Sequence, residues 1–162
     1  MNIELRPATD ADLPLLFDLY ASAREPELAQ VPWSAEQKRI FLEMQFAAQR
    51  AGYAASHPHA SHDMICVDGE PIGRLYLDRT EDFHILDITV APAHRNRGVG
   101  TTVLNSIVAE ADLAGQTVSI YTELFNPSLR LFERLGFRQK SVDGFLVLLE
   151  KPTRAAAVPP AD

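Results

Sequence analysis

The sequence is poor in cysteine, has fewer basic than acidic side chains, and contains no long apolar run. Its one cysteine, Cys66, excludes a disulfide within the chain and a cysteine-rich metal site. Fifteen Lys and Arg residues against 22 Asp and Glu give a net charge of −7, which argues against general binding to nucleic-acid phosphates. No apolar run approaches a membrane span, and residues 1–7 lack the pattern of a signal peptide. We therefore expect a cytoplasmic protein that binds neither nucleic acid nor membrane.

The remaining composition is that of an ordinary globular protein. Hydrophobic residues make up 46% and charged residues 23% of 162 residues, which indicates one folded domain. We expect that domain over residues 1–151 and a disordered Ala- and Pro-rich tail over 152–162. Cys66 lies in an apolar run, so we expect a buried thiol without a catalytic role. His57, His59 and His62 have no regularly spaced carboxylate or thiol beside them, which favours a polar loop over a metal site.

Hydrophobic periodicity predicts the order β-α-α-β-β-β-α-β-α-β-β, which is typical of a mixed sheet covered by helices. The expected strands are 3–6, 63–67, 71–78, 82–90, 118–122, 138–143 and 145–150. The expected helices run from 10 or 12 to about 23, from 34 through at least 51, from 98 to 114 and from 127 to 135. Ser34 and Gln37 fit a capping box, and Asp68-Gly69 is typical of a hairpin turn. The second helix is expected to turn one face to the core: Ile40, Phe41, Met44, Ala47, Ala48 and Ala51.

The most informative stretch links the strand ending at Val90 to the next helix. It carries Arg95 and Arg97, and then Gly98 and Gly100 where the helix opens. The first N–H groups of a helix lack internal partners, and the helix dipole makes that end positive. Glycines let a phosphate approach the backbone, and the arginines add positive charge. This arrangement predicts a pyrophosphate site.

Two well-known phosphate motifs do not fit this stretch. A Walker motif requires Lys and then Ser or Thr after its second glycine, but Gly100 is followed by Thr101-Thr102. A Rossmann fingerprint requires three closely spaced glycines directly after the strand, and here there are two after a longer linker. A helix that merely begins with glycines and solvated arginines remains the alternative.

Two motifs make the chain resemble the GNAT superfamily of acyl-CoA-dependent acyltransferases. Residues 95–100, Arg-Asn-Arg-Gly-Val-Gly, match the R/Q-x-x-G-x-G/A motif of that family. About thirty residues later, residues 126–137 resemble its N…L-Y-x-x-x-G-F motif. Over roughly residues 3–150, the resemblance implies an α/β (α+β) fold. Its mixed, mostly antiparallel seven-stranded sheet has splayed central parallel strands and about four flanking helices.

The resemblance also implies a site for acetyl-CoA as cosubstrate, without a metal. In such proteins acyl-CoA fills the gap between the splayed strands and passes its acyl group directly to an amine, with the oxyanion held by a backbone N–H, here near Val90. The implied coenzyme-binding residues are Ile88, Thr89, Val90, Arg95, Asn96, Arg97, Gly98, Val99, Gly100, Thr101, Asn126 and Phe132.

The catalytic groups are less clearly indicated. Phe132 stands where the family usually has a tyrosine that protonates the leaving thiolate; water, or Tyr121 as a weaker substitute, would have to supply that proton. The candidate general bases are Glu123, His84 and Asp87. Asp87 could instead pair with an arginine, and His84 could be a satisfied core or edge histidine. A bulge in the strand would move the following side chains to the opposite face of the sheet, so the alternation of residues does not show which candidate faces the coenzyme.

The acceptor site of such folds is walled by the first two helices and their connection. There the sequence offers Arg24, Glu25, Glu27 and Trp33; a solvated loop with one buried tryptophan is the alternative. We expect an N-acetyltransferase for a primary amine of a small molecule or protein, acting as a monomer or homodimer. The competing hypotheses are a non-catalytic acyl-CoA-binding module or sensor, suggested by Phe132, and an interaction domain with no nucleotide ligand.

Overall fold

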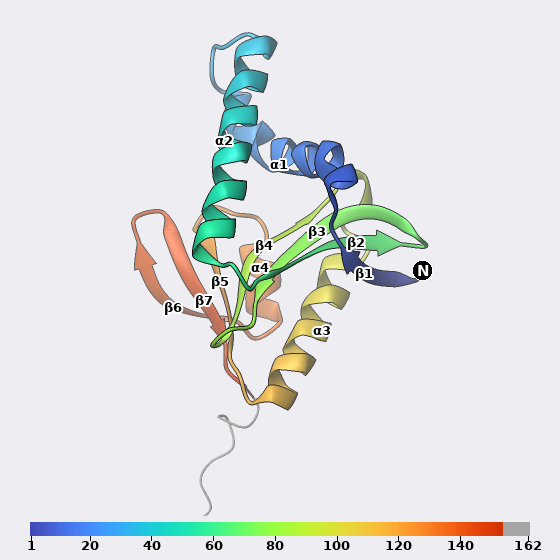
Figure 1. Cartoon of the computed structure of the whole chain (residues 1–162). Coiled ribbons are helices and arrows are strands. Elements are labelled where there is room, and N and C mark those ends of the chain that lie inside the picture. Colours follow the sequence, from blue (N-terminus) through green and yellow to red (C-terminus); the bar gives the residue numbers. More distant parts are fainter. Residues whose placement is uncertain (154–162) are drawn as a thin grey trace, which may run out of the picture.

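The computed structural model describes residues 1–153, which form one sheet with helices on both faces (Figure 1). The elements, in chain order, are β1 (Ile3–Pro7), η1 (Asp10–Asp12), α1 (Leu13–Leu28), α2 (Ala35–Ser56), β2 (Ser61–Val67), β3 (Glu70–Asp78), β4 (Phe83–Val90), η2 (Pro92–His94), α3 (Val99–Ala114), β5 (Val118–Glu123), α4 (Leu129–Arg134), β6 (Arg138–Asp143) and β7 (Leu146–Lys151). The predicted order of strands and α-helices is confirmed. Most of the predicted tail, from residue 154 onward, lies outside the described residues.

The seven strands of the described chain lie in the order β1-β2-β3-β4-β5-β7-β6, and every neighbouring pair is antiparallel except β4 and β5. These two central parallel strands are paired only at their beginnings, through Phe83↔Val118, His84↔Ser119 and Ile85↔Ile120. Beyond Ile85 they have no register with each other, although β4 continues for five more residues. The expected splay of the central strands is therefore present, and it opens toward their carboxyl ends.

A β-bulge at Leu86 sets the faces of β4. Leu77 opposes Ile85 and Tyr76 opposes Asp87, so Leu86 has no partner on β3. Consequently His84 and Asp87 lie on the same face of the sheet, although they are three residues apart and regular alternation would separate them. Alternation along the sequence could not assign a face to these two base candidates, because it does not reveal the bulge.

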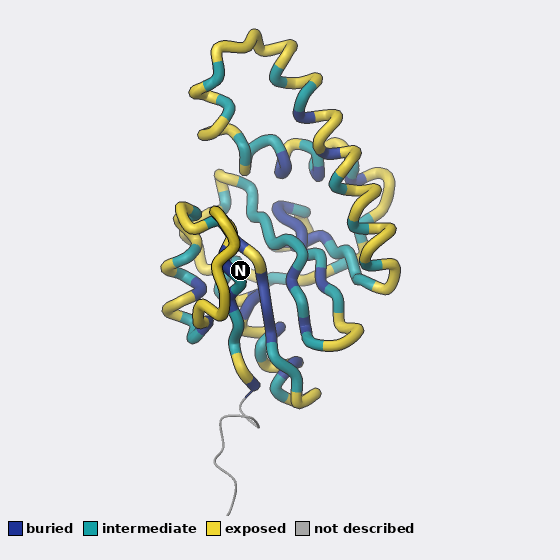
Figure 2. Tube along the Cα trace, turned by 90° about the vertical axis from the view of Figure 1, so that its left-hand side faces the viewer, coloured by how far each residue is buried: buried dark blue, intermediate teal, exposed yellow. Residues whose placement is uncertain are grey.

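Each face of the sheet has its own hydrophobic core. The larger core packs α3 and α4 against one face; its buried members include Leu75, Ile85, Val103, Leu104 and Phe132. The smaller core packs α1 and α2 against the other face through Leu16, Tyr20, Leu42, Phe46, Met64 and Cys66. Cys66 is 4% exposed, which confirms the expected buried thiol. Figure 2 shows the buried residues concentrated in the central strands.

The end of α1 and the start of α4 differ from the predictions, whereas α2 contains its whole predicted stretch. Helix α1 continues to Leu28 instead of ending near residue 23, because Leu28 packs against the smaller core and outweighs the hydrogen bond lost at Pro26. Helix α2 extends to Ser56. Helix α4 begins later than expected, at Leu129, because the Asn126 side chain accepts a hydrogen bond from the Ser128 N–H at 2.8 Å and holds a turn there.

The predicted inward face of α2 is wrong. Its buried residues are Leu42 and Phe46, whereas Ile40 is 47% and Met44 66% exposed. The helix carries apolar residues on two sides. The buried side carries Phe46, whose ring centroid lies 5.7 Å from that of Phe17 and 5.5 Å from that of Tyr20, both on α1. These rings belong to the smaller core, which also contains Met64 and Cys66 of β2. No helix within residues 1–153 is both long and apolar enough to cross a membrane.

Candidate functional site

The turn from β4 into α3 presents unpaired backbone amides. Asn96 (φ 62°) and Gly98 (φ 80°) are left-handed, a conformation that gathers successive N–H groups around a concavity suited to an anion. Within the described residues, the N–H groups of residues 97–101 donate to no acceptor, and the first helical bond runs from the Thr102 N–H to the Gly98 carbonyl at 3.0 Å. Five unpaired amides therefore gather at the positive end of a 16-residue helix.

The side chains of this turn differ in their contacts and burial. Arg95 Nε donates to the Val90 carbonyl at 3.0 Å, which ties the turn to the end of β4. Arg97 is exposed, and Val99, at 2% exposed, anchors the helix start in the larger core. A Cβ atom at Gly98 or Gly100 would meet no atom within 4 Å, so open space lies beside the unpaired amides.

The free edge of β4 offers a second set of backbone groups. The Ala91 N–H donates to the Ile72 carbonyl of β3 at 2.8 Å, so by alternation the N–H groups of Ile88 and Val90 point the other way, toward the splay. The Thr89 N–H points toward β3, and the Thr89 hydroxyl donates to Asp87 at 2.9 Å. Of the three strand residues implied for pantetheine, two thus present their amides to the splay.

Asp87 is engaged in a polar network on the face covered by α2. Its carboxylate accepts a hydrogen bond from Arg74 Nε at 2.6 Å, and Arg74 also donates to Gln49 at 2.6 Å. The Arg74 side chain is 3% exposed, so it needs this counter-ion. The arginine pairing considered as the alternative for Asp87 is therefore present.

His84 lies on the same face, at the closed end of the splay. Its Nδ1 lies 2.8 Å from Ser119 Oγ, and the Ser119 hydroxyl donates to Asp82 at 2.7 Å. The ring is stacked on His57 at 6.2 Å and meets the edge of Tyr121 at 5.6 Å. Partial burial is the main cause that lowers the pKa of His84 below its usual value.

The third base candidate, Glu123, ends β5 and is partly exposed. It shares a face with Ser119 and Tyr121 by alternation. Its carboxylate makes no hydrogen bond or ion pair with any residue of the described chain. Glu123 therefore lies at the open end of the splay, four residues from the Ser119 that contacts His84.

The two residues of the second motif have local structural contacts. Phe132 is 4% exposed and meets Phe137 edge-on at 5.5 Å within the larger core. The side-chain oxygen of Asn126, Oδ1, accepts a hydrogen bond from the Ser128 N–H in the turn before α4. The side-chain NH2 group of Asn126 is therefore the part that could reach a ligand.

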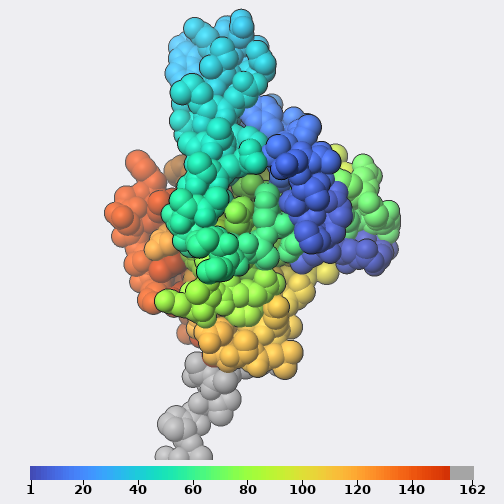
Figure 3. Space-filling model, in the orientation of Figure 1, coloured from blue at the N-terminus to red at the C-terminus, as the bar shows by residue number. Residues whose placement is uncertain are grey.

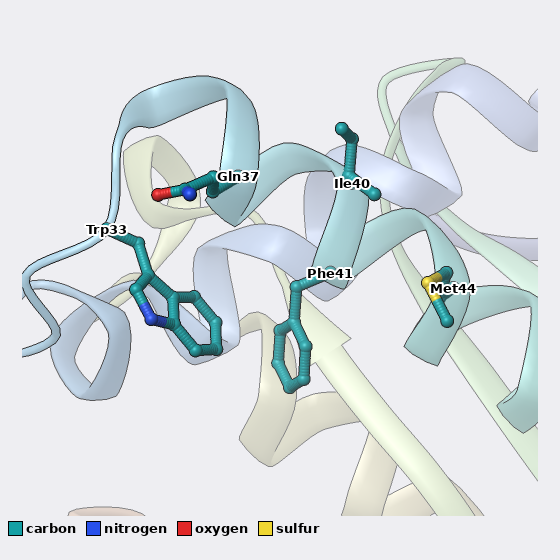
Figure 4. A pocket seen from close by; sticks show the side chains of 5 residues that line it. All are labelled: Trp33, Gln37, Ile40, Phe41 and Met44. Carbon is teal, nitrogen blue, oxygen red and sulfur yellow. The ribbon is translucent and has the colours of Figure 1, made fainter.

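The four acceptor-site candidates do not converge. Arg24, Glu25 and Glu27 lie on α1 rather than in a loop, and the Arg24 guanidinium covers the Tyr20 ring at 3.7 Å. Glu25 lines a hollow between α1 and α2. Trp33 lines a different hollow of about 310 Å³ together with Gln37, Ile40, Phe41 and Met44 (Figure 4). Trp33 is 42% exposed, so the alternative of a buried tryptophan is wrong. Figure 3 shows this end of the two helices projecting beyond the sheet.

The histidine-rich stretch is not wholly a loop. His57 caps the end of α2 and lies 2.7 Å from Asp78, whereas His62 belongs to β2 and stacks on Tyr76 at 4.5 Å. Burial lowers the pKa of His62 to about 4. Within residues 1–153 no three His, Cys, Asp or Glu residues come together in a group able to hold a metal ion.

Comparison with known proteins agrees with this geometry. A model of the acetyltransferase (GNAT) family matches residues 15–137, which span both motifs and the splayed strands. The chain belongs to the GNAT acetyltransferase family. This GNAT chain is 40% identical over 63 residues to a mycothiol acetyltransferase of Clavibacter michiganensis; the aligned stretch covers 39% of the chain but only 20% of that relative.

Solved structures support the GNAT fold. The PaiA N-acetyltransferase from Thermoplasma acidophilum, in complex with coenzyme A, has a TM-score of 0.72 at 18% identity, covering 94% of this chain and 99% of that protein. A GNAT family acetyltransferase from Elizabethkingia anophelis with acetyl-CoA bound has a TM-score of 0.60 at 21% identity, covering 93% and 98%. At these identities the likeness concerns the fold.

Several residues of this site escaped the sequence analysis. Ser119 contacts His84, which lies 35 positions away in the chain, and donates to Asp82, which lies 37 positions away. Arg74 reaches Asp87 from the neighbouring strand. The pairing of these strands brings the residues together, and nothing local in the sequence marks them. Gly73 was also missed: a Cβ atom there would lie 2.5 Å from the Thr89 carbonyl oxygen, so only glycine fits against β4.

Proposed function

We propose that this chain is an acetyl-CoA-dependent N-acetyltransferase that moves the acetyl group directly to a primary amine of a small molecule or a protein. The observation that carries the proposal is the set of five unpaired amides at residues 97–101, beside open space at a helix N-terminus. Membership of the GNAT family, and the coenzyme in the solved structures of similar fold, support it.

The coenzyme would lie along β4. Its diphosphate would accept hydrogen bonds from the amides of residues 97–101, with Arg97 adding charge. The pantetheine arm would meet the amides of Ile88 and Val90 on the free edge. The unpaired stretch Leu86–Val90 spans about 16 Å, comparable to an extended pantetheine arm, so the thioester would reach the closed end of the splay.

The reaction follows from that placement. The neutral amine attacks the thioester carbonyl, the C–N bond forms, and the oxyanion accepts a hydrogen bond from a β4 amide near the closed end of the splay. Val90, the residue expected from the sequence, lies at the opposite end of the arm in this placement. The C–S bond then breaks, and the amine proton leaves through a base. Phe132 has no proton to give, so the thiolate stays ionised or takes a proton from another donor; a free thiol has a pKa of about 8.5.

Calorimetry with acetyl-CoA, followed by thiol-release assays with a panel of amines, tests the proposal. We expect Gly98→Glu to weaken coenzyme binding at least tenfold, because it places a strained side chain and a negative charge among the amides. Gly69→Glu is the matched control, since Gly69 has a similar φ of 84° in the β2–β3 turn. Wild-type protein that produces no heat with acetyl-CoA would overturn the proposal.

The same assays separate the enzyme from a non-catalytic acyl-CoA-binding module, the alternative that Phe132 favours. Binding without thiol release for any amine would identify the module. For the enzyme, we expect Phe132→Tyr to change the catalytic rate or its pH dependence more than coenzyme affinity. A change in affinity alone would contradict a position for residue 132 beside the sulfur.

We further propose a cytoplasmic enzyme that acts as a monomer or homodimer without nucleic-acid or membrane partners. The net charge of −7 supports the absence of a nucleic-acid partner. Arg24, Glu25, Glu27 and Trp33 remain the proposed acceptor-side residues, and Trp33 contributes an exposed aromatic surface to that side.

A further inference from the structure

We propose that His84 is the general base of the transfer, and that Ser119 and Asp82 position it by fixing its imidazole in the tautomer protonated on Nδ1. This inference rests on the proposed acetyl transfer and assigns the proton path at that same site. His84 would be the catalytic residue, while Ser119 and Asp82 would act through it.

The hydrogen bonds of Ser119 determine the tautomer. A serine hydroxyl has one hydrogen, and an ionised carboxylate can only accept. Ser119 therefore donates to Asp82 at 2.7 Å, and its oxygen accepts from His84 at 2.8 Å. The hydrogen on His84 must then lie on Nδ1. Because a neutral imidazole carries one N–H, Nε2 keeps its lone pair and is free to take a proton.

The position of His84 fits that task better than those of the other candidates. His84 pairs with Ser119 directly before the last paired residues of β4 and β5, where the extended arm of the coenzyme would end. Glu123 lies four residues beyond Ser119, about 13 Å along β5. Asp87 is held by the buried Arg74. His84 is thus the candidate beside the expected thioester whose basic atom is not already engaged.

The surroundings keep His84 available as a base near neutral pH. The charged and titratable groups that face it are Asp82 before β4, Asp78 of β3, His57 at the end of α2 and Tyr121 of β5, with Lys140 of β6 acting on Asp82 and Tyr121. Burial outweighs the carboxylates and lowers the pKa of His84. The ring is therefore neutral at pH 7, and it becomes protonated and inactive on acidification.

The proton released by the amine passes through His84 to the leaving group or to water. As the C–N bond forms, Nε2 of His84 takes a proton from the attacking nitrogen and becomes imidazolium, stabilised through Ser119 by Asp82. When the C–S bond breaks, the thiolate or water takes this proton. The products are an amide and free coenzyme A, and His84 returns to its starting state.

The first test replaces the base. In His84→Asn the amide NH2 can still donate toward Ser119, but the basic nitrogen is gone. We expect kcat/KM to fall at least 100-fold and to lose its rise with pH, which in wild type lies below about pH 6.5 because the pKa of His84 is lowered. Calorimetry should give an acetyl-CoA affinity within twofold of wild type. His57→Asn is the matched control, because it removes the stacked neighbour but leaves the rise with pH. An unchanged pH profile in His84→Asn would overturn the proposal.

The second test reads the tautomer without catalysis. Imidazole 15N shifts in wild-type protein should show the proton on Nδ1 of His84, and Ser119→Ala should shift the population toward Nε2–H. We expect about tenfold lower kcat/KM in Ser119→Ala, a lower apparent pKa in its pH profile, and recovery in Ser119→Thr, with thermal melting as a check of folding. A wild-type ring protonated on Nε2 would overturn the assignment. Absence of acetyl-CoA binding would instead refute the proposed function and leave the tautomer result standing.

Discussion

At the scale of single residues, Gly73 controls how closely β3 can approach β4. A Cβ atom at this position would lie 2.5 Å from the Thr89 carbonyl oxygen and 3.3 Å from Val90 Cα, and backbone atoms cannot swing aside. We expect Gly73→Ala to destabilise the protein by about 1–3 kcal/mol in urea unfolding and to weaken acetyl-CoA binding, because the free edge of β4 would move.

Gly52 provides the matched control for this substitution. It lies within α2, and a Cβ atom there would meet nothing within 4 Å. Gly52→Ala should therefore stabilise the protein by up to about 1 kcal/mol and leave binding unchanged. Equal effects of the two substitutions would contradict the close approach of β3 to β4.

The Arg6–Asp12 pair links stability to pH. Arg6 donates two hydrogen bonds of 2.8 Å to Asp12, and together with the Thr9 N–H these bonds hold the pKa of Asp12 well below its usual range. A carboxyl with a depressed folded-state pKa stabilises the fold above its unfolded pKa, and that contribution is lost as pH falls. Asp12→Asn should be less stable than wild type at pH 7, and the difference in urea midpoints should shrink below about pH 4. A difference independent of pH would contradict this role.

Single residues with a local signature could be predicted from sequence, whereas residues that meet through the sheet could not. Gly98 needs a left-handed backbone at a helix start, and Cys66 stands in an apolar run; both are visible in a few neighbouring letters. The contact of Ser119 with Asp82 depends on the register of β4 against β5, which the sequence does not encode locally.

At the scale of elements, α2 supports the fold through one of its two apolar sides. Phe46 is 8% exposed and contacts two aromatic rings of α1, whereas Met44 is 66% exposed. We expect Phe46→Ala to lower the free energy of unfolding by about 3–5 kcal/mol. Met44→Ala should change it by less than about 0.5 kcal/mol. Similar losses in urea unfolding would mean that the opposite side of α2 is covered in solution.

The order of the elements was predictable because each has a strong local signal. Ser34 and Gln37 form the expected capping box with bonds of 3.1 and 2.9 Å, and Asp68 and Gly69 take the left-handed angles of a tight hairpin turn. Periodicity could not reveal which apolar side of α2 meets the sheet, because both sides satisfy a helical spacing. The bulge at Leu86 was equally hidden, since one unpaired residue leaves no mark on composition.

At the scale of the whole molecule, the two parts of the described sheet are joined only by the short parallel pairing of residues 83–85 of β4 with residues 118–120 of β5, called the seam below. Strands β1 to β4 and strands β5 to β7 are connected across the sheet by three residue pairs. Few backbone hydrogen bonds hold the seam, so it should open more readily than the long β2–β3 ladder.

Hydrogen exchange can test this expectation. Without ligand, amides at the seam should exchange faster than those in the middle of β3. With acetyl-CoA, protection should rise in segments 86–90 and 97–101, because the ligand would occupy the splay and the unpaired amides of the turn. Protection appearing instead at β1 or β6 would contradict a ligand site between the central strands.

The extra residue at Leu86 leaves the length of the sheet unchanged at this point. A chain without it would keep Tyr76 opposite Asp87 and Leu77 opposite Ile85, so β3 alone sets the distance from His84 to the end of β4. The unpaired residue instead contacts the helical layer, because the Tyr53 hydroxyl of α2 donates a hydrogen bond to the Leu86 carbonyl at 3.2 Å. Deleting Leu86 would therefore remove a tie between α2 and β4 at the place where the two central strands begin to separate.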